Sequence, residues 1–422
     1  MVSGISTVKS QQNQVNSSSV YSYLGLGTPY DNLSPAGSGM SLIGVAIPDP
    51  FRASVANPAL WGATSYTVGS GSFSIVNFSV SDDFDSGNNT NFDFGHFQIV
   101  APVIRNRLGF SLAMYPETNS RFQISSSGSQ NLPTADSIST VGFTNNSSGI
   151  GGLNKLELGF GVRLTDNILF GYAASLMFGL ETIERQLTFD NTMYRSVNYA
   201  ERTRYKGFSH RFGIAASSSR FLGQNDRIVF GATATIPSEL TAHKRFTSRI
   251  QSGSTIRDND LIPESDFGKR TINYPFETTV GLSYFPRSYF LIGAEFQYQQ
   301  WSELTTFDGV LDPNTKDRLR IAFGLEYDAS SRFSEGFFRS FIYRLGTSYD
   351  NGHLNILDKD IQTIMFTAGL GIPSRAFGSS IDLNLDFGIR GTKSNSLVQE
   401  RIFAIRASFN LSEPMFFQRR LN

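Results

Sequence analysis

The sequence contains no cysteine, which excludes disulfide bonds and thiolate metal sites. It also lacks any run of about 18 apolar residues, so no helix is expected to span a membrane. Lys plus Arg and Asp plus Glu balance at 36 each, and this neutrality gives no reason to expect nucleic acid as a partner. A membrane protein is still allowed, because a β-barrel carries its apolar side chains at every second position.

Residue sets that would indicate catalysis or metal binding are also missing. The four histidines lie far apart, without the spacing of metal ligands: His96, His210, His243 and His353. No P-loop, no Gly-x-Ser-x-Gly elbow and no Cys–His pair occurs. An enzyme built on a barrel wall would need a Ser/His/Asp set, and none stands out. We therefore expect a protein that is not an enzyme and has neither a cofactor nor a metal site.

A strict two-residue alternation is present in the C-terminal half of the chain. Between Ser380 and Arg390, five apolar residues alternate with polar residues and glycine: Ile381, Leu383, Leu385, Phe387 and Ile389. A period of two indicates a strand with one apolar and one polar face. A soluble β-sandwich would also alternate, but its typical strand has only about 5–6 residues. The longer segments here favour strands that cross a membrane.

Such segments recur from about Tyr66 to Leu411. The predicted strands are residues 66–81, 90–105, 107–124, 153–165, 167–188, 205–220, 226–245, 270–286, 288–304, 317–329, 338–352, 360–373, 378–392 and 398–411. Long loops are expected at 125–152, 189–204, 246–269 and 305–316, and they alternate with short turns, as in outer-membrane barrels. The sequence thus predicts an all-β fold, a transmembrane antiparallel β-barrel of about 14 strands with both termini in the periplasm.

The polar faces of the predicted strands carry charged side chains. A charge on the lipid-facing side at mid-depth would cost ~2–4 kcal/mol, so these groups should point into one lumen. The predicted lumen-facing residues are Glu277, Glu295, Arg344, Asp382, Asp386, Arg390 and Arg406. Two interpretations remain open. The charges either fill the barrel as a structural network of ion pairs, or they line a path that conducts or binds a ligand.

Pro116 interrupts the predicted strand 107–124. Proline removes a donor from the ladder and is normally excluded from central strands. A closed barrel has no edge strand, so Pro116 must mark a bulge, a kink or the end of the strand. It lies either at the outer rim, above the membrane, or at a lateral gap in the wall.

Two stretches carry a resemblance to a known family. The segment GMSLIGVAIPDPFRASVANPALWG (39–62), with its motif Asn57-Pro58-Ala59, resembles the N-terminal region of the FadL-like outer-membrane transporters. The segment INYPFETTVGLSYFPRSYFLIGAEFQYQQWSEL (272–304) is similar to a Pro-led strand, short turn and acidic-aromatic strand of the same family. The resemblance implies a 14-stranded barrel that is plugged by an N-terminal hatch.

The domain organisation follows from this resemblance and from composition. Residues 1–20 are polar, show no signal peptide and are expected to be a disordered or added leader. Residues 21–65 are the expected hatch, in which Asn57 would hydrogen-bond to the backbone and Pro58 would stiffen the turn. Residues 66–411 are the expected barrel, and residues 412–422 a periplasmic tail.

The resemblance also implies a function. It points to passive uptake of hydrophobic small molecules, such as long-chain fatty acids or aromatic hydrocarbons, across a Gram-negative outer membrane. Lateral release through the wall, with Pro116 at the opening, would deliver them to the membrane. Membrane lipid or lipopolysaccharide and the hydrophobic ligand are the expected partners. The alternative is a FadL-like barrel that acts as a scaffold or adaptor subunit of a secretion or assembly machine, because fold does not determine function.

Overall fold

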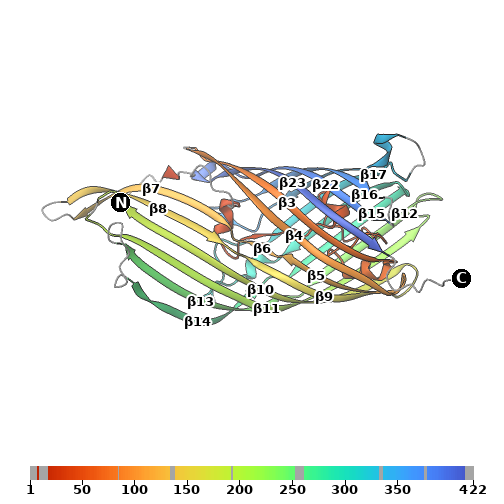
Figure 1. Ribbon diagram of the computed structural model, residues 1–422, viewed down its shortest axis with the longest axis horizontal. Helices are drawn as coiled ribbons and strands as arrows, with labels where there is room; N and C mark the ends of the chain where they lie inside the picture. Colours follow the sequence, from red (N-terminus) through yellow and green to blue (C-terminus); the bar gives the residue numbers. More distant parts are fainter. Residues whose placement is uncertain are drawn as a thin grey trace.

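The computed structural model describes residues 7–8, 18–83, 85–133, 138–191, 193–251, 261–331, 336–374 and 378–413. Within these residues the strands form a closed antiparallel barrel of 14 strands (Figure 1), which confirms the predicted fold class. The last strand pairs with the first long one and closes the ring. No helix in the described part of the chain has the length and apolar character needed to cross a membrane.

Some positions in the wall are shared by two strands in line: β5 and β7, β8 and β9, β12 and β13, and β14 and β15. The wall strands are β3 (Thr67–Ser81), β4 (Ser86–Ile104), β5 (Leu108–Pro116), β7 (Phe122–Pro133), β8 (Ile138–Ile150), β9 (Leu153–Arg163), β10 (Ile168–Phe189), β11 (Ser196–Ser219), β12 (Arg227–Thr235), β13 (Ser238–Gln251), β14 (Leu261–Tyr274), β15 (Glu277–Arg287), β16 (Phe290–Gln299), β17 (Arg318–Asp328), β18 (Ile342–Asp350), β21 (Thr363–Pro373), β22 (Ser380–Gly391) and β23 (Gln399–Glu413).

Shorter elements lie inside the ring or between its strands. They are β1 (Thr7–Val8), β2 (Thr28–Pro29), β6 (Thr118–Asn119), β19 (Asn355–Ile356) and β20 (Lys359–Asp360), with the helical turns η1 (Val20–Tyr23), α1 (Pro35–Ser38), η2 (Pro58–Ala63), η4 (Trp301–Glu303), η5 (Phe337–Ser340) and η6 (Ser394–Ser396).

The alternation in β22 separates an outer from an inner face. Leu385 and Phe387 point outward and are 50% and 49% exposed, whereas Asp382 and Asp386 point inward and are 0% and 1% exposed. An apolar outer face is what lipid requires, and the buried carboxylates need partners inside the barrel.

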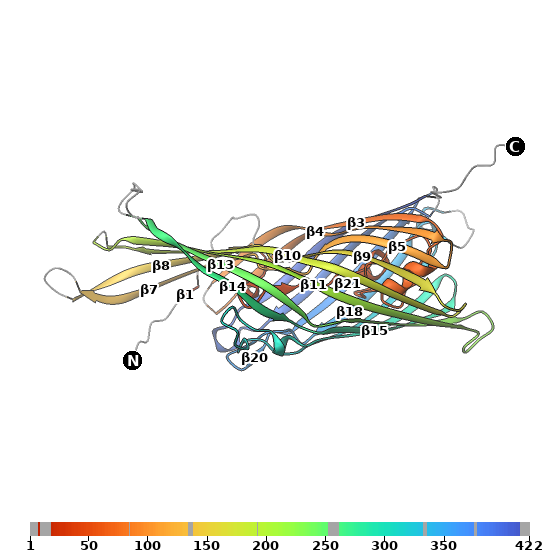
Figure 2. The ribbon, with the colours of Figure 1, turned by 90° about the horizontal axis from the view of Figure 1, so that it is seen from below.

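The connections between strands differ in length at the two ends of the barrel. Short turns join β4 to β5, β9 to β10 and β15 to β16 at one end, here called the short-turn end. At the other end, the long-loop end, the hairpins β7–β8, β10–β11 and β13–β14 extend well beyond the ring (Figures 1 and 2).

Three predicted loops are therefore wrong. Residues 125–152 contain most of the β7–β8 hairpin, residues 189–204 contain the start of β11, and residues 246–269 belong largely to β13 and β14. The physical reason is that these strands pair in water, where neither face needs to be apolar. Residues 252–260, within the third of these ranges, lie outside the described part of the chain.

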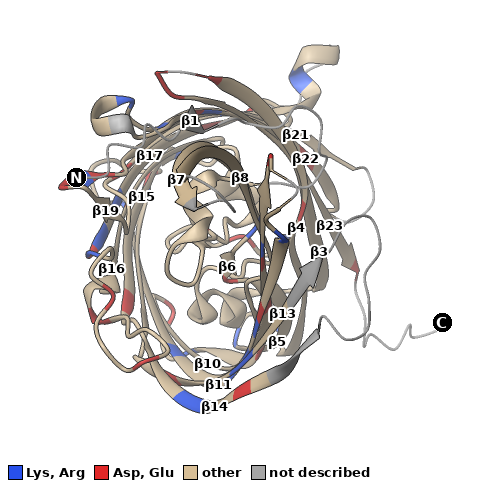
Figure 3. Ribbon diagram, turned by 90° about the vertical axis from the view of Figure 1, so that its left-hand side faces the viewer, with Lys and Arg blue, Asp and Glu red and all other residues tan. Residues whose placement is uncertain are grey.

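Seen end-on, the ring holds short helical turns in its interior (Figure 3). They belong to the N-terminal segment, residues 18–66, whose contacts extend from one end of the barrel to the other. Near the long-loop end, the Ser19 hydroxyl and the Val20 amide donate to the carboxylate of Glu400 at the start of β23. At the short-turn end, Asn106 in the β4–β5 turn donates to the Thr64 carbonyl. The barrel begins and ends at the short-turn end, where Thr67 pairs with Glu413, as the predicted strand directions require. The first described residues of the N-terminal segment, however, lie at the long-loop end. Residues 18–20, expected as disordered leader, are ordered here, and β23 continues to Glu413.

Glycines on the inner wall make room for this segment. A Cβ atom added at Gly346 would lie 2.0 Å from the Met40 carbonyl oxygen, and one added at Gly161 would lie 2.4 Å from the Pro58 carbonyl oxygen. Neighbouring strands repeat the feature, since Gly161 pairs with Gly171 and Gly346 pairs with Gly324. The backbone of the N-terminal segment therefore packs directly on the backbone of the wall.

Candidate functional site

The predicted motif Asn57-Pro58-Ala59 stands at the start of η2. The Asn57 side chain is fully buried and accepts a hydrogen bond from the Ala59 amide at 3.0 Å. Its amide group donates to the Val45 carbonyl at 2.8 Å and to the Ile214 carbonyl of β11 at 3.1 Å. Pro58 occupies the first helical position, where its missing N–H costs nothing. One side chain thus ties two parts of the N-terminal segment to the wall.

Glu295 holds the same segment from another strand of the wall. It lies on β16, is 5% exposed and points inward. Its carboxylate accepts hydrogen bonds from three consecutive backbone amides, those of Ile43, Gly44 and Val45, the last two at 2.8 Å. Three donors that would otherwise be buried without partners are therefore satisfied by one side chain.

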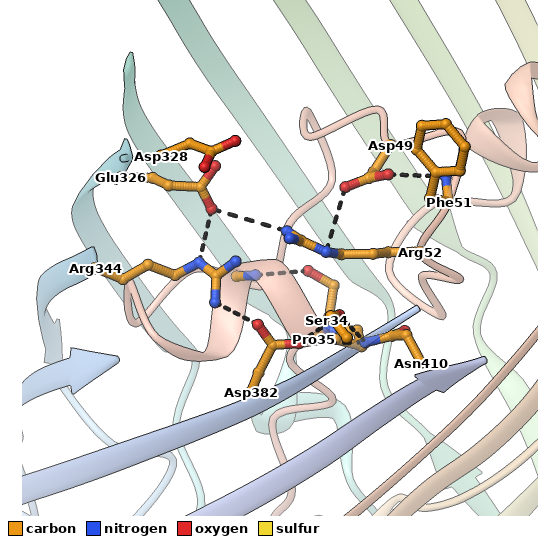
Figure 4. A network of polar contacts seen from close by, with 12 residues as sticks. Ser34, Pro35, Asp49, Phe51, Arg52, Glu326, Asp328, Arg344, Asp382 and Asn410 are labelled. Atoms are coloured by element: carbon orange, nitrogen blue, oxygen red, sulfur yellow. Dashed lines mark hydrogen bonds and ion pairs between the residues drawn. The ribbon is translucent and has the colours of Figure 1, made fainter. Parts of the chain in front are cut away.

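Arg344 lies at the centre of a buried ionic network (Figure 4). Its guanidinium contacts Glu326 and Asp382, each at 2.6 Å, and the arginine and Asp382 side chains are fully buried. Glu326 also lies 4.0 Å from Arg52 of the N-terminal segment, which in turn contacts Asp49 at 3.5 Å. The network therefore connects the N-terminal segment with β17, β18 and β22.

The other predicted lumen residues also face inward, but they form separate groups. Arg406 contacts Asp386 at 2.7 Å, and Arg390 lies 3.6 Å from Glu400. Glu277 accepts a hydrogen bond from the Gln297 side chain. Most of the predicted charges are therefore paired with other side chains.

A cavity of about 180 Å³ lies between the N-terminal segment and β3, β17, β18 and β21–β23. We call it the lumen cavity. Apolar side chains line part of it and charged side chains line the rest, including Phe78, Met365, Ile402, Arg318, Asp386 and Arg406. His353 belongs to a loop that covers it. Burial, together with nearby Arg318 and Arg390, lowers the pKa of His353 to about 3.

The wall is interrupted at Pro116. The chain leaves the ring after this residue, and Thr118–Asn119 pairs with Thr28–Pro29 of the N-terminal segment inside the barrel. The chain rejoins the sheet as β7. The edge of β7 that does not face β8 pairs with β1, and not with β4. Among the described residues, β4 between Ser86 and His96 has a strand partner on its β3 side alone. We call this interruption between β4 and β7 the gap.

A second cavity, the lateral pocket, lies at the gap and has a volume of about 650 Å³. Phe92 and Phe94 of β4, Pro116, and Leu176 and Phe178 of β10 give it apolar walls. Three residues line both this pocket and the lumen cavity: Tyr30, Asp93 and Asn119. The two cavities are therefore adjacent, and these three residues belong to the wall of both.

Several functional positions were missed in the sequence. Arg52 and Asp31 are in the N-terminal segment, where no alternation marks them, yet Asp31 contacts Arg318 at 2.9 Å. Gly151 and Gly152 adopt φ of +130° and +134° beside the gap and let the wall bend there. Two adjacent glycines within a predicted loop were the available signal. In the described residues, no group of three His, Cys, Asp or Glu side chains could hold a metal ion.

Several solved structures have a similar fold and share little sequence identity with this chain. A Pseudomonas aeruginosa FadL homologue superposes with a TM-score of 0.61 at 12% identity, covering 92% of this chain and 99% of that chain. The CymD monoaromatic hydrocarbon channel gives 0.55 at 13%, covering 92% and 99%, and the Ralstonia pickettii toluene transporter TbuX gives 0.55 at 14%, covering 90% and 98%. These likenesses confirm the FadL-like fold.

Sequence comparison gives the family. The chain has no match among curated proteins. A family model described as BamG matches residues 1–422, the whole sequence, and the chain therefore belongs to the BamG family.

Proposed function

We propose that this protein is an outer-membrane channel that takes up hydrophobic small molecules and releases them sideways through the gap. The observation that carries the proposal is that the lumen cavity and the lateral pocket are adjacent and share Tyr30, Asp93 and Asn119 in their linings. The path would open between these three side chains. A lipid-like solute crosses a polar leaflet poorly, so it needs shelter until it reaches apolar surroundings. Phe92 and Phe94, which are 58% and 39% exposed, would provide them at the exit.

The N-terminal segment would act as the hatch. Asn57 and Glu295 fix its backbone to β11 and β16, so that residues 40–62 close the lumen toward the short-turn end. With that path closed, a solute that enters from the long-loop end has the lateral pocket as its outlet. An irregular plug is tolerated at this depth because it is buried in protein and not in lipid.

A disulfide across the gap tests the proposal. The side chains of Asp93 and Asn119 approach within 3.5 Å, and the chain has no cysteine of its own. The pair Asp93→Cys/Asn119→Cys would therefore link β4 to β6. Uptake of radiolabelled oleate and toluene should be measured in Gram-negative cells that lack their own channel, because their outer leaflet is the barrier.

We expect uptake to fall at least tenfold on oxidation and to recover on reduction, a factor of ten being about 1.4 kcal/mol. The matched control is Asn77→Cys/Thr90→Cys, whose parent side chains lie 2.9 Å apart between β3 and β4, so that this disulfide forms on the paired side of β4 and does not cross the gap. Equal uptake by the oxidised and reduced forms of the Asp93/Asn119 pair would contradict lateral release.

A second function, as a scaffold or adaptor subunit of an outer-membrane complex, is favoured by the extended hairpins. The β7–β8, β10–β11 and β13–β14 hairpins project beyond the ring, and most of the predicted lumen charges are already paired. The match of the whole chain to the family model described as BamG is consistent with this role.

Extraction in mild detergent, followed by native electrophoresis, tests the second function. Removing the β7–β8 tip, residues 128–143, should release a stoichiometric partner and leave uptake unchanged if the hairpins bind protein. Migration as a lone chain before and after the deletion would contradict it.

A further inference from the structure

A column of cations lies on the outer wall beside the gap. Arg202, Arg204 and Lys206 alternate along β11, so all three project from the same face, about 7 Å apart. All three are exposed, and they form no hydrogen bond or ion pair with any residue that the structure describes. The next outward residue toward the short-turn end is Phe208, which is 65% exposed.

The neighbouring strands enlarge this column. Arg245 of β13 stands directly opposite Arg202, and His243 stands opposite Arg204. Lys269 of β14 lies opposite His243. Like charges that face each other across strands destabilise a sheet unless an anion lies between them.

The acidic side chains of this face are too few to neutralise its positive charges. Asp266 accepts from His243 at 2.8 Å and lies 3.7 Å from Arg245. Glu184 is exposed and lies further out, opposite Ala200. We call Arg202, Arg204, Lys206, Arg245 and Lys269 the basic column. Its excess of positive charge leaves room for an anionic ligand.

The basic column ends where the apolar wall begins. Arg204 and Lys206 line the lateral pocket together with Leu176 and Phe178. Lys206 pairs across the ladder with Phe178, and Phe208 with Leu176, so the change from charged to apolar occurs within one pair. A ligand that fits both parts has an anionic head and an apolar tail.

We propose that this face binds a lipid of the surrounding outer leaflet that carries phosphate groups, with its phosphates on the basic column and an acyl chain over Phe208 and Leu176. Arginine forms bidentate hydrogen bonds with phosphate, and basic pockets at membrane interfaces recognise anionic head groups. Several cations spaced along one strand suit a head group with more than one phosphate. The inference rests on the proposed function only in placing the protein in the outer membrane.

The lipid would form one wall of the lateral pocket. Its acyl chain would lie beside Leu176 and Phe178, which a solute leaving through the gap must pass. A bound lipid at this point would keep the exit apolar and would fix the height of the gap in the membrane.

Native mass spectrometry of the full-length protein in detergent tests the site. The probes are bisphosphorylated lipid A, its monophosphorylated form and phosphatidylcholine. The variant Arg204→Ser/Lys206→Ser removes two charges, and Arg287→Ser/Arg339→Ser removes two exposed charges near the other end. We expect bisphosphorylated lipid A to bind best and to lose affinity roughly 30-fold in the first variant alone, since each cation near a membrane surface contributes about fivefold.

Equal binding of the three lipids, or equal loss in both variants, would overturn the inference. Binding of an acidic protein in place of lipid would overturn it as well. Full lipid binding by Arg204→Ser/Lys206→Ser would refute this site but would leave the gap untouched. The proposed function is tested separately, by the loss of uptake when the Asp93→Cys/Asn119→Cys disulfide closes the gap. That result does not depend on which lipid binds to the basic column.

Discussion

Replacement of Glu295 by alanine should loosen the N-terminal segment while the barrel stays folded. The carboxylate accepts three backbone hydrogen bonds, from Ile43, Gly44 and Val45. Hydrogen bonds to a charged group contribute about 1.5 kcal/mol each at the lower end of their range, so roughly 4 kcal/mol is lost in total. Since a factor of ten is about 1.4 kcal/mol, the opening equilibrium of this segment should rise about a thousandfold.

Hydrogen exchange measures this directly at the amides of residues 43–45. The control is Glu277→Ala, which removes an inward carboxylate on the neighbouring strand β15 that accepts from Gln297. Exchange at residues 43–45 should accelerate in Glu295→Ala and stay near the native rate in Glu277→Ala. Protection that is unchanged in Glu295→Ala, or lost equally in both variants, would refute the reasoning.

Three other perturbations probe the wall, the ionic network and the loops. Gly152→Ala should destabilise the barrel by about 3 kcal/mol, because φ is +134° and the new Cβ would lie 2.2 Å from the Thr118 carbonyl oxygen. Thermal unfolding should show this loss, and it should show none for Gly69→Ala, which has open space around it. Arg344→Met should cost about 3–5 kcal/mol in the unfolding free energy, since Glu326 and Asp382 lose their shared partner. Adding Asp382→Asn should recover part of that loss, and full additivity of the two changes would contradict the shared contact. His353 has a folded-state pKa of about 3, below its unfolded value of about 6.5, so the unfolded chain binds the extra proton and stability falls as pH drops through that window. Chemical denaturation at pH 5 should show a loss of about 2 kcal/mol relative to pH 7. In His353→Gln this part of the pH dependence of the unfolding free energy should disappear. The same loss between pH 7 and pH 5 in the variant would contradict its assignment to His353.

The strands from residue 317 onward could be predicted closely because lipid constrains them, whereas the predicted strand 270–286 is wrong, since it joins the end of β14 to β15. β22 was expected at 378–392 and spans Ser380–Gly391, and β23 was expected at 398–411 and spans Gln399–Glu413. Their outer faces must be apolar, so the surrounding lipid requires an apolar side chain at every second position. The inward direction of Asp382 and Asp386 followed from the same argument.

The β7–β8 hairpin could not be found in this way. Its strands, FQISSSGSQNLP and ISTVGFTNNSSGI, are polar on both faces because they extend beyond the ring. A strand surrounded by water is stabilised by its partner's backbone, and single-residue patterns do not record that partner. The same cause explains the missed beginnings of β11 and β14.

The path of the N-terminal segment and the shape of the gap depend on long-range contacts. Pro116 indicated a break in the wall, and β5 does end there. The inward turn that follows, however, is held by Tyr30, whose amide donates to the Glu117 carbonyl, and by Asn32, whose side chain donates to the Pro116 carbonyl. These partners are more than 80 residues away in the chain, so no local pattern could reveal them.

The same limit applies to the glycines of the inner wall. The sequence contains 39 of them, and their number does not show which ones face the N-terminal segment. Only the structure places Gly231 and Gly346 against the Val45 and Met40 carbonyl groups. A glycine that admits another backbone looks the same in the sequence as one in a turn.

The central claim, that a solute path joins the lumen to the membrane through the gap, is tested most directly by electron cryo-microscopy of protein purified without added lipid. The account predicts elongated density that runs from the lumen cavity past Tyr30 and Asn119 into the lateral pocket. It also predicts that β4 remains unpaired on this side between Ser86 and His96. Direct pairing of β4 with β7, with no density between the two cavities, would contradict it.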